Sequence, residues 1–210
     1  NHEYTTGGTY DVSLTATGPG GIDTETKTNY ITVYTPVVAS FTGSPTSGVG
    51  PLEVAFTNQS TGNFTELSWD FGDGNTSNDA NPVHIYTENG SYTVTLTASG
   101  PGGTDIETYT DYITVYQAVN AEFSADLTNG IAPLEVHFTN LSTGGYATLS
   151  WDFGDGGTST DANPTYVYNA GGTFTVTLTV SGNGGTDQET KTAYISIYSP
   201  VTADFTYSLA

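Results

Sequence analysis

Two pairs of closely spaced aspartates are the residues of this sequence that come nearest to an acid–base site. Asp70 and Asp73 lie three positions apart in the segment Trp-Asp-Phe-Gly-Asp-Gly, and Asp152 and Asp155 repeat that spacing in a second copy of it. A glycosidase would need a raised pKa on one carboxyl group and a cleft between the pair. Each pair instead flanks a glycine-rich turn, in which an aspartate hydrogen-bonds to its own backbone. We therefore interpret all four as turn residues and expect no catalytic site.

Oxygen-bearing side chains in the same two loops could bind calcium, which takes several oxygen ligands. The candidate ligands are Asp73, Asp79, Asp155 and Asp161. Their spacing differs from that of an EF-hand loop, so solvated loop residues are the simpler interpretation. We expect no cofactor, with calcium as the alternative that a chelator would test.

Several asparagines are candidate sites for N-linked glycans, because they begin Asn-x-Ser/Thr sequons. Asparagine, serine and threonine are so frequent here that a similar number of sequons is expected by chance. The sequons are therefore only candidate acceptors, at Asn58, Asn63, Asn75, Asn89 and Asn140.

The charge of the chain excludes two classes of partner. Its formal net charge is -20, because 22 acidic residues are set against only two cationic ones, Lys27 and Lys191. Nucleic-acid binding and attraction to anionic lipid both need clustered cations. We expect neither nucleic-acid binding nor membrane insertion, and a cationic partner would suit this surface better.

The chain is built from a repeat of 82 residues, the spacing between Trp69 and Trp151. Two full copies align without a gap and share 48 identical positions. Both ends match parts of the same repeat, so we expect the chain to be one part of a longer array of repeats. The expected domains are 1–34 (the C-terminal part of a domain), 35–116 and 117–198 (complete domains) and 199–210 (the first strand of a further domain).

Alternation of apolar and polar residues dominates each copy and predicts β-strands. In residues 92–98 every second residue is apolar and those between are threonine, the pattern of a strand with one face in a core and one in water. Gly-Pro-Gly-Gly at 100–103 predicts a hairpin turn. We predict about seven strands per repeat in a two-sheet antiparallel sandwich, with Trp69 or Trp151 at the centre of each core.

Very short linkers join the repeats. Only Gln117 and Ala118 separate Tyr116 from the apolar pattern of the next copy. A linker of this length leaves little room for independent motion. We therefore expect the sandwiches to form a stiff, rod-like array.

The two lysines share one repeat position, which Tyr109 fills in the copy between them. A lysine in a β-sandwich can form an isopeptide bond with Asn or Asp. Because the middle copy lacks the lysine, we interpret Lys27 and Lys191 as solvated strand residues.

The ordered motifs of each copy resemble the PKD (polycystic kidney disease) domain family. The resemblance covers both complete repeats and both partial ends. It implies all-β, immunoglobulin-like (PKD-type) antiparallel β-sandwiches in tandem, located outside the cell or on its surface. The motifs are Pro-Leu-Glu-Val-Ala-Phe-Thr-Asn at 51–58, Trp-Asp-Phe-Gly-Asp-Gly at 69–74, Asn81-Pro82, Tyr86 and Gly-Ser-Tyr-Thr-Val-Thr-Leu-Thr at 90–97, with matching segments from Pro133 to Thr179.

The same resemblance implies a spacer, adhesive or scaffold role, or help in engaging an insoluble polymer. We predict a structural or adhesive extracellular segment of a stalk, surface layer or filament. The alternative is an accessory polymer- or protein-binding module of a secreted hydrolase. The expected partners are neighbouring repeats or copies of the chain, together with glycans or an extracellular polymer.

Overall fold

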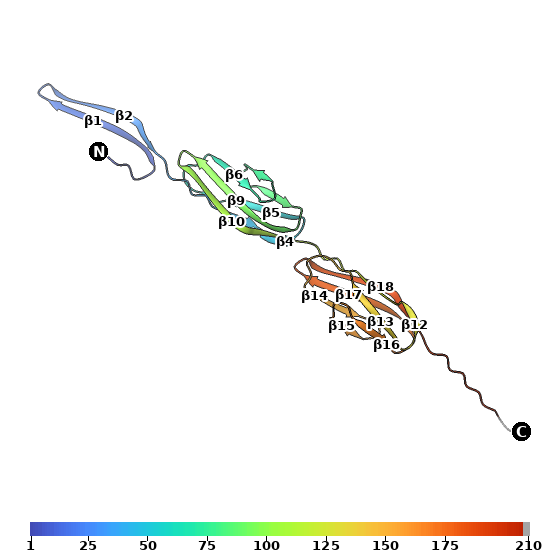
Figure 1. Ribbon diagram of the computed structural model, residues 1–210. Helices are drawn as coiled ribbons and strands as arrows, with labels where there is room; N and C mark the ends of the chain where they lie inside the picture. Colours follow the sequence, from blue (N-terminus) through green and yellow to red (C-terminus); the bar gives the residue numbers. More distant parts are fainter. Residues whose placement is uncertain (208–210) are drawn as a thin grey trace. The chain divides into compact units, whose positions relative to one another are not determined.

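The computed structural model describes residues 1–207, which lie in strands, turns and loops (Figure 1). The chain divides into two compact units at Thr114–Val115, with Gly48–Gly50 belonging to the second unit. The predicted all-β class is confirmed for this part of the chain. No helix long and apolar enough to span a membrane is found among the described residues.

The first complete repeat folds as a sandwich of two sheets. Its strands are β3 (Phe41–Ser44), β4 (Ser47–Val49), β5 (Leu52–Asn58), β6 (Glu66–Asp70), β7 (Thr76–Ser77), β8 (Val83–Tyr86), β9 (Gly90–Gly100) and β10 (Gly103–Tyr116). One sheet has the order β3-β5-β8 and the other the order β4-β10-β9-β6-β7. The pairing of β6 with β9 sets Trp69 opposite Leu96, and both side chains are fully buried.

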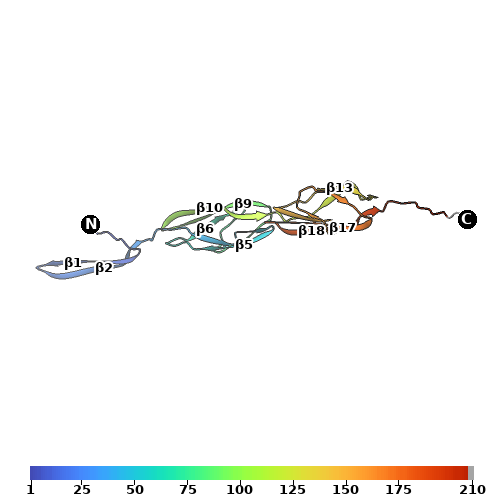
Figure 2. The same cartoon turned by 90° about the horizontal axis from the view of Figure 1, so that it is seen from below.

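The second complete repeat has the same arrangement. Its strands are β11 (Phe123–Ala125), β12 (Asn129–Ile131), β13 (Leu134–Asn140), β14 (Thr148–Asp152), β15 (Thr158–Ser159), β16 (Thr165–Tyr168), β17 (Gly172–Gly182) and β18 (Gly185–Tyr198). The sheets have the orders β11-β13-β16 and β12-β18-β17-β14-β15. Figure 2 shows β13 in one layer and β17 with β18 in the other.

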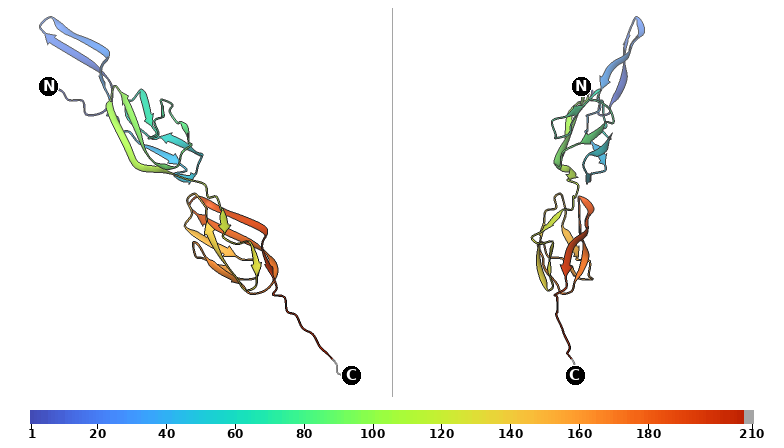
Figure 3. Two further views of the ribbon diagram at one scale, coloured as in Figure 1. Left: turned by 45° about the vertical axis from the view of Figure 1, so that its right-hand side comes forward. Right: turned by 90° about the vertical axis from the view of Figure 1, so that its right-hand side faces the viewer.

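The first residues of the chain form a two-stranded sheet of their own, β1 (Gly8–Gly18) with β2 (Gly21–Val33) (Figure 3). This hairpin corresponds to β9 and β10 of the repeat. Leu14 is 71% exposed on it, whereas its counterpart Leu96 is 0% exposed. The alternating apolar side chains are therefore buried in the complete repeats but exposed to solvent on the hairpin.

Each core is an aromatic cluster around the tryptophan. Trp151 is 0% exposed, and its ring lies 5.2 Å from that of Phe123 and 5.6 Å from that of Phe138. The apolar residues of β17 and β18 cover it from their own sheet. Burial of large aromatic side chains dominates the stability of such a core. The strand faces that are buried are those that the apolar alternation predicts.

A strand pairing of the second repeat departs from the predicted antiparallel pattern. β12 runs parallel to β18, with Gly130 opposite Ile197. The chain first pairs in one sheet as β11 and then crosses to the other sheet as β12. Because the crossing keeps the direction of the chain, β12 meets β18 in parallel.

A left-handed residue interrupts each long hairpin at the same place. Asn29, Asp111 and Ala193 have φ of 53°, 51° and 52°. The pairing register shifts beside this position in the first and last hairpins. Such a conformation suits asparagine or aspartate and is unfavourable for alanine.

The residues that begin each complete repeat are hydrogen-bonded to the body of that repeat. The Val119 N–H donates to the Gly184 carbonyl at 3.0 Å, and the Gly145 N–H donates to the Gln117 carbonyl at 3.2 Å. In the preceding repeat, the Val37 N–H donates to the Gly102 carbonyl at 3.2 Å. The short linker therefore belongs structurally to the repeat that follows it.

Candidate functional site

The glycine-rich turn after Trp69 contains the first pair of aspartates. Asp70 Oδ1 accepts a hydrogen bond from the Gly72 N–H at 2.9 Å, and Asp73 Oδ1 accepts one from the Asn75 N–H at 3.0 Å. Gly72 has φ of +80°, a conformation that glycine adopts without strain. Both carboxylates thus fold the backbone of their own loop.

The second repeat builds the same turn. Asp152 Oδ1 accepts a hydrogen bond from the Gly154 N–H at 2.8 Å, and Asp155 Oδ1 accepts one from the Gly157 N–H at 3.0 Å. In both repeats these carboxylate oxygens have backbone partners, so neither pair has the arrangement of an acid and a base facing a substrate.

The core tryptophans connect this turn region to the sheet. The Trp69 Nε1–H donates to the Asp79 carbonyl at 2.9 Å, and the Trp151 Nε1–H donates to the Asp161 carbonyl at 3.0 Å. The buried indole N–H is therefore satisfied by backbone, as a buried polar group requires.

The two repeats differ in the side chain that meets the second aspartate. In the first repeat His84 Nε2 lies 2.7 Å from Asp73 Oδ2, and because a carboxylate only accepts, the Nε2–H donates. The His84 ring stacks on Phe71 at 4.2 Å. In the second repeat the Tyr166 hydroxyl donates to Asp155 Oδ1 at 2.7 Å. A histidine and a tyrosine thus serve the same structural position.

These contacts shift two pKa values in opposite directions. Burial alone would raise the pKa of Asp73, but hydrogen bonds from His84 and Asn75 outweigh it and hold that pKa below its ordinary value. Burial and the hydrogen bond to Asp155 raise the pKa of Tyr166 to about 12. Neither shift leaves a proton donor or acceptor poised near neutral pH, which general acid–base catalysis needs.

The candidate calcium ligands lie in two loops. Asp79 and Asp161 each accept a hydrogen bond of 3.3 Å from a serine two residues earlier, while Asp73 and Asp155 are engaged as described above. Among residues 1–207, no three His, Cys, Asp or Glu side chains gather closely enough to hold a metal ion. Calcium binding stays an untested alternative.

The sequon asparagines differ in how their side chains are used. The amide Nδ2, the atom that would carry a glycan, donates to Asp73 in Asn75 and to the Tyr146 hydroxyl in Asn140. Asn89 is exposed in the turn between β8 and β9. The remaining two asparagines accept backbone hydrogen bonds through Oδ1, at Asn58 and Asn63.

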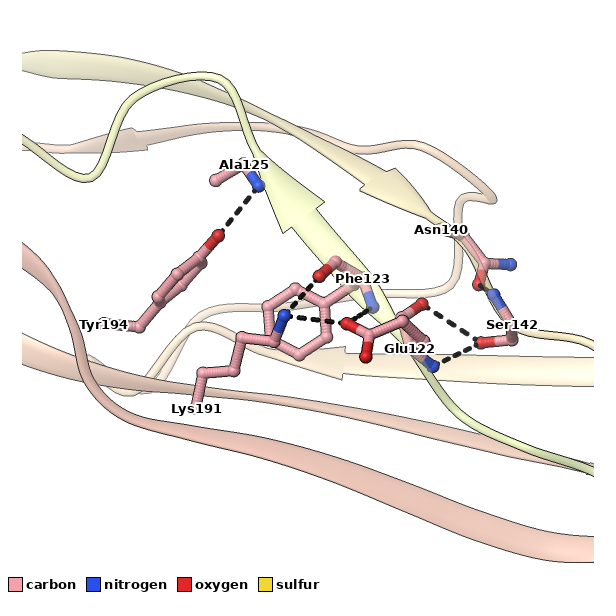
Figure 4. Close-up of polar contacts among 7 residues, drawn as sticks. All are labelled: Glu122, Phe123, Ala125, Asn140, Ser142, Lys191 and Tyr194. Atoms are coloured by element: carbon pink, nitrogen blue, oxygen red, sulfur yellow. Dashed lines mark hydrogen bonds and ion pairs between the residues drawn. The ribbon is translucent and has the colours of Figure 1, made fainter.

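The amine of the half-buried Lys191 lies against polar and aromatic groups (Figure 4). Its Nζ lies 2.7 Å from Glu122 Oε1 and 2.5 Å from the Phe123 carbonyl oxygen, and 4.7 Å from the centroid of the Phe123 ring. The hydrogen bond from Lys191 lowers the pKa of Glu122. The interpretation of this lysine as a solvated strand residue therefore needs correction, because strand β18 directs it onto β11.

The first repeat fills this position differently. Tyr109 lies 4.7 Å from the Phe41 ring and 5.0 Å from the Tyr112 ring, and Ser40 stands where the second repeat has Glu122. The lysine and its acid thus occur together, and the tyrosine and the serine occur together. In both repeats the side chain at this position packs on the equivalent core phenylalanine, Phe41 or Phe123.

A polar groove on the first complete repeat was not predicted from the sequence. It has a volume of about 410 Å³ and lies beside β6 and β9. The groove depends on where the chain leaves the sheet after β7, which no local sequence signal reveals. Its lining residues are Thr65, Glu66, Leu67, Ser68, Asn78, Thr97 and Ser99.

The sandwich topology and the repeated turn motif occur together in a known domain family. The family model described as PKD domain matches residues 35–115 and again residues 117–197. The chain belongs to the PKD domain family. PKD domains are non-catalytic modules, which agrees with the hydrogen-bonded aspartates of both turns.

Two relatives are named as a collagenase and a metalloprotease. Collagenase ColA of Bacillus cereus is 39% identical over 80 residues, which cover 36% of this chain and 8% of the collagenase. Pre-pro-metalloprotease PrtV of Vibrio cholerae is 37% identical over 71 residues, which cover 34% of this chain and 8% of that protein. The similarity therefore spans about a twelfth of each relative, at one PKD-sized segment.

A solved structure of low sequence identity shows the same fold. The I-band fragment I67-I69 of titin matches with a TM-score of 0.64 at 12% identity, covering 92% of this chain and 75% of the fragment. At this identity the likeness concerns the fold alone. It confirms the immunoglobulin-like sandwiches that the strand pattern predicted.

Proposed function

We propose that this chain is a non-catalytic accessory segment of a secreted hydrolase, and that it engages a polymeric protein substrate. The observation that carries the proposal is the pair of relatives named as a collagenase and a metalloprotease, each similar over one PKD-sized segment. The satisfied carboxylates of both turns also support a role outside the chemical step.

This proposal differs from the function that the sequence alone favoured. The sequence alone favours a stalk, surface-layer or filament segment, with the accessory module as the alternative. The names of the relatives support the alternative better. Stiffness of the array, adhesion, filament formation and glycosylation stay predictions.

Co-sedimentation tests the proposed function. The 210-residue chain is mixed with insoluble collagen fibrils, and with chitin and cellulose as polysaccharide controls, and the pelleted fraction is measured. We expect saturable binding to the protein fibrils and little binding to the polysaccharides. A chain that stays in the supernatant with every polymer would contradict the proposal.

A further inference from the structure

One sheet of the first complete repeat has a partly open edge. β6 pairs with β9 along its whole length, but on its other side β7 pairs only with Trp69 and Asp70. Within the described part of the chain, residues 66–68 therefore have no strand on their outer side. Alternate residues of a strand direct their N–H and C=O groups to opposite sides. Leu67 is in phase with Trp69, which pairs with Ser77, so Leu67 presents a free backbone N–H and C=O at the open edge. Glu66 and Ser68 direct theirs to β9.

The edge stays open because the chain turns away after β7. Ser77 Oγ accepts a hydrogen bond from the Asp79 N–H at 3.1 Å, and the Trp69 Nε1–H holds the Asp79 carbonyl at 2.9 Å. These two hydrogen bonds hold the backbone after Ser77 away from β6, so it does not continue the pairing. The interruption is therefore fixed by the core tryptophan itself.

The polar groove lies directly beside this edge. Leu67 faces the sandwich interior, while Glu66 and Ser68 are exposed on the outer side of the sheet, opposite Ser99 and Thr97. The groove volume of about 410 Å³ falls in the range of ligand sites. Glu66 is the one ionisable residue among its lining side chains, so a ligand with a positive charge fits it best.

We propose that residues 66–68 bind an extended cationic peptide segment by β-strand addition, in line with β7, with a Lys or Arg of the peptide beside Glu66. Main-chain hydrogen bonds supply the affinity in such a mode, and side-chain contacts set the register. The inference rests on the proposed function, since a protein substrate supplies extended cationic segments. A second copy of this chain is a poor ligand because its net charge is -20 with only two lysines.

The second complete repeat supplies a matched control. β15 pairs only with Trp151 and Asp152, so β14 has the same partly open edge. Thr148 stands there in place of Glu66, and Thr160 in place of Asn78. Thr148→Glu should therefore confer charge selection on the second repeat, and Glu66→Thr should remove it from the first.

Residue-resolved NMR of the ¹⁵N-labelled 210-residue chain tests the site at about 150 mM NaCl, where long-range attraction is screened. The probes are a blocked peptide of alternating Thr and Lys, its Thr-Glu counterpart, and the Thr-Lys peptide with alternate backbone nitrogens methylated. We expect the Thr-Lys peptide to shift the amide signals of residues 66–68. Binding should fall by about tenfold in Glu66→Thr and be lost with the methylated peptide, which cannot donate to the edge.

The opposite results overturn the proposal. Shifts spread over the acidic surface, equal binding by the methylated peptide, or unchanged binding by Glu66→Thr would each show that charge alone attracts the peptide. Co-sedimentation with collagen fibrils separates this inference from the proposed function. If the chain pellets with fibrils but the peptide does not shift the β6 amide signals, the proposed function stands and the β6 site is wrong.

Discussion

At the scale of single residues, Ala193 occupies a backbone conformation that its repeat counterparts fill with better-suited side chains. Its φ is 52°, close to the 53° of Asn29 and the 51° of Asp111. We expect Ala193→Asn to raise the free energy of unfolding of the second repeat by about 0.5–1 kcal/mol, because asparagine tolerates the left-handed region better. Urea titration of the variant measures this change. Thr192→Asn, a neighbouring exposed position, is the control and should leave stability unchanged.

The His84–Asp73 pair is the second residue-scale feature with a measurable consequence. His84→Phe keeps a ring to stack on Phe71 but removes the hydrogen bond to Asp73. We expect a loss of about 1–2 kcal/mol at pH 7, since a largely buried hydrogen bond to a charged group is lost. A double-mutant cycle with Asp73→Asn measures the coupling, and additive losses would contradict it.

The pH dependence of that pair follows from the lowered pKa of Asp73. A carboxyl group whose folded pKa is lowered contributes stability above its unfolded pKa and loses it as the pH falls through the folded value. The difference between the wild type and His84→Phe should therefore be present at pH 7 and shrink below the ordinary aspartate pKa of 3.8. A difference that stays constant down to pH 2 would show that only packing was lost.

At the scale of elements, glycines hold the linker residues against the repeat that follows. A Cβ on Gly184 would collide with the Gln117 carbonyl, whereas a Cβ on Gly20, the same repeat position in the β1–β2 hairpin, would meet open space. We expect Gly184→Ala to destabilise the second repeat by about 1–3 kcal/mol, because the backbone must shift. Gly20→Ala should leave the melting temperature unchanged. Equal effects at the two positions would show that the linker contact is unimportant.

The elements also show which features a sequence reveals and which it does not. Strand alternation and the glycine turns are local patterns, so β9, β10 and the hairpin turn between them are predictable from residues 92–103. The docking of Gln117 against Gly145 and Gly184 joins distant parts of the chain, and glycine there resembles an ordinary turn residue. Long-range partners of this kind have no local signature.

The candidate sites follow the same division. The aspartate turns after Trp69 and Trp151 involve partners two residues apart, which is why their composition indicates them. The contact of Lys191 with Glu122 joins residues 69 positions apart. The open edge of β6 depends on where β7 ends. Neither the Lys191 contact nor the open edge can be predicted without knowing how the strands pair.

At the scale of the whole molecule, a net charge of -20 with two lysines produces self-repulsion in the folded chain. Added salt screens this repulsion within a Debye length that falls from about 30 Å at 0.01 M to about 8 Å at 0.15 M. We therefore expect the melting temperature to rise as NaCl is increased over this range. CaCl2 at matched ionic strength should give the same rise, and a clearly larger one would reveal a calcium site.

The contacts of the Lys191 amine have a consequence for how the chain can be cut. Trypsin cleaves after lysine or arginine, and this chain offers only Lys27 and Lys191. Lys27 lies on the exposed β1–β2 hairpin, whereas the Lys191 amine is bound to Glu122 and the Phe123 carbonyl within a packed sandwich. Limited digestion should therefore release residues 1–27 and leave a single resistant fragment from Thr28 onward. Early cleavage after Lys191 would show that β18 detaches readily, and Glu122→Ser would be expected to hasten that cut.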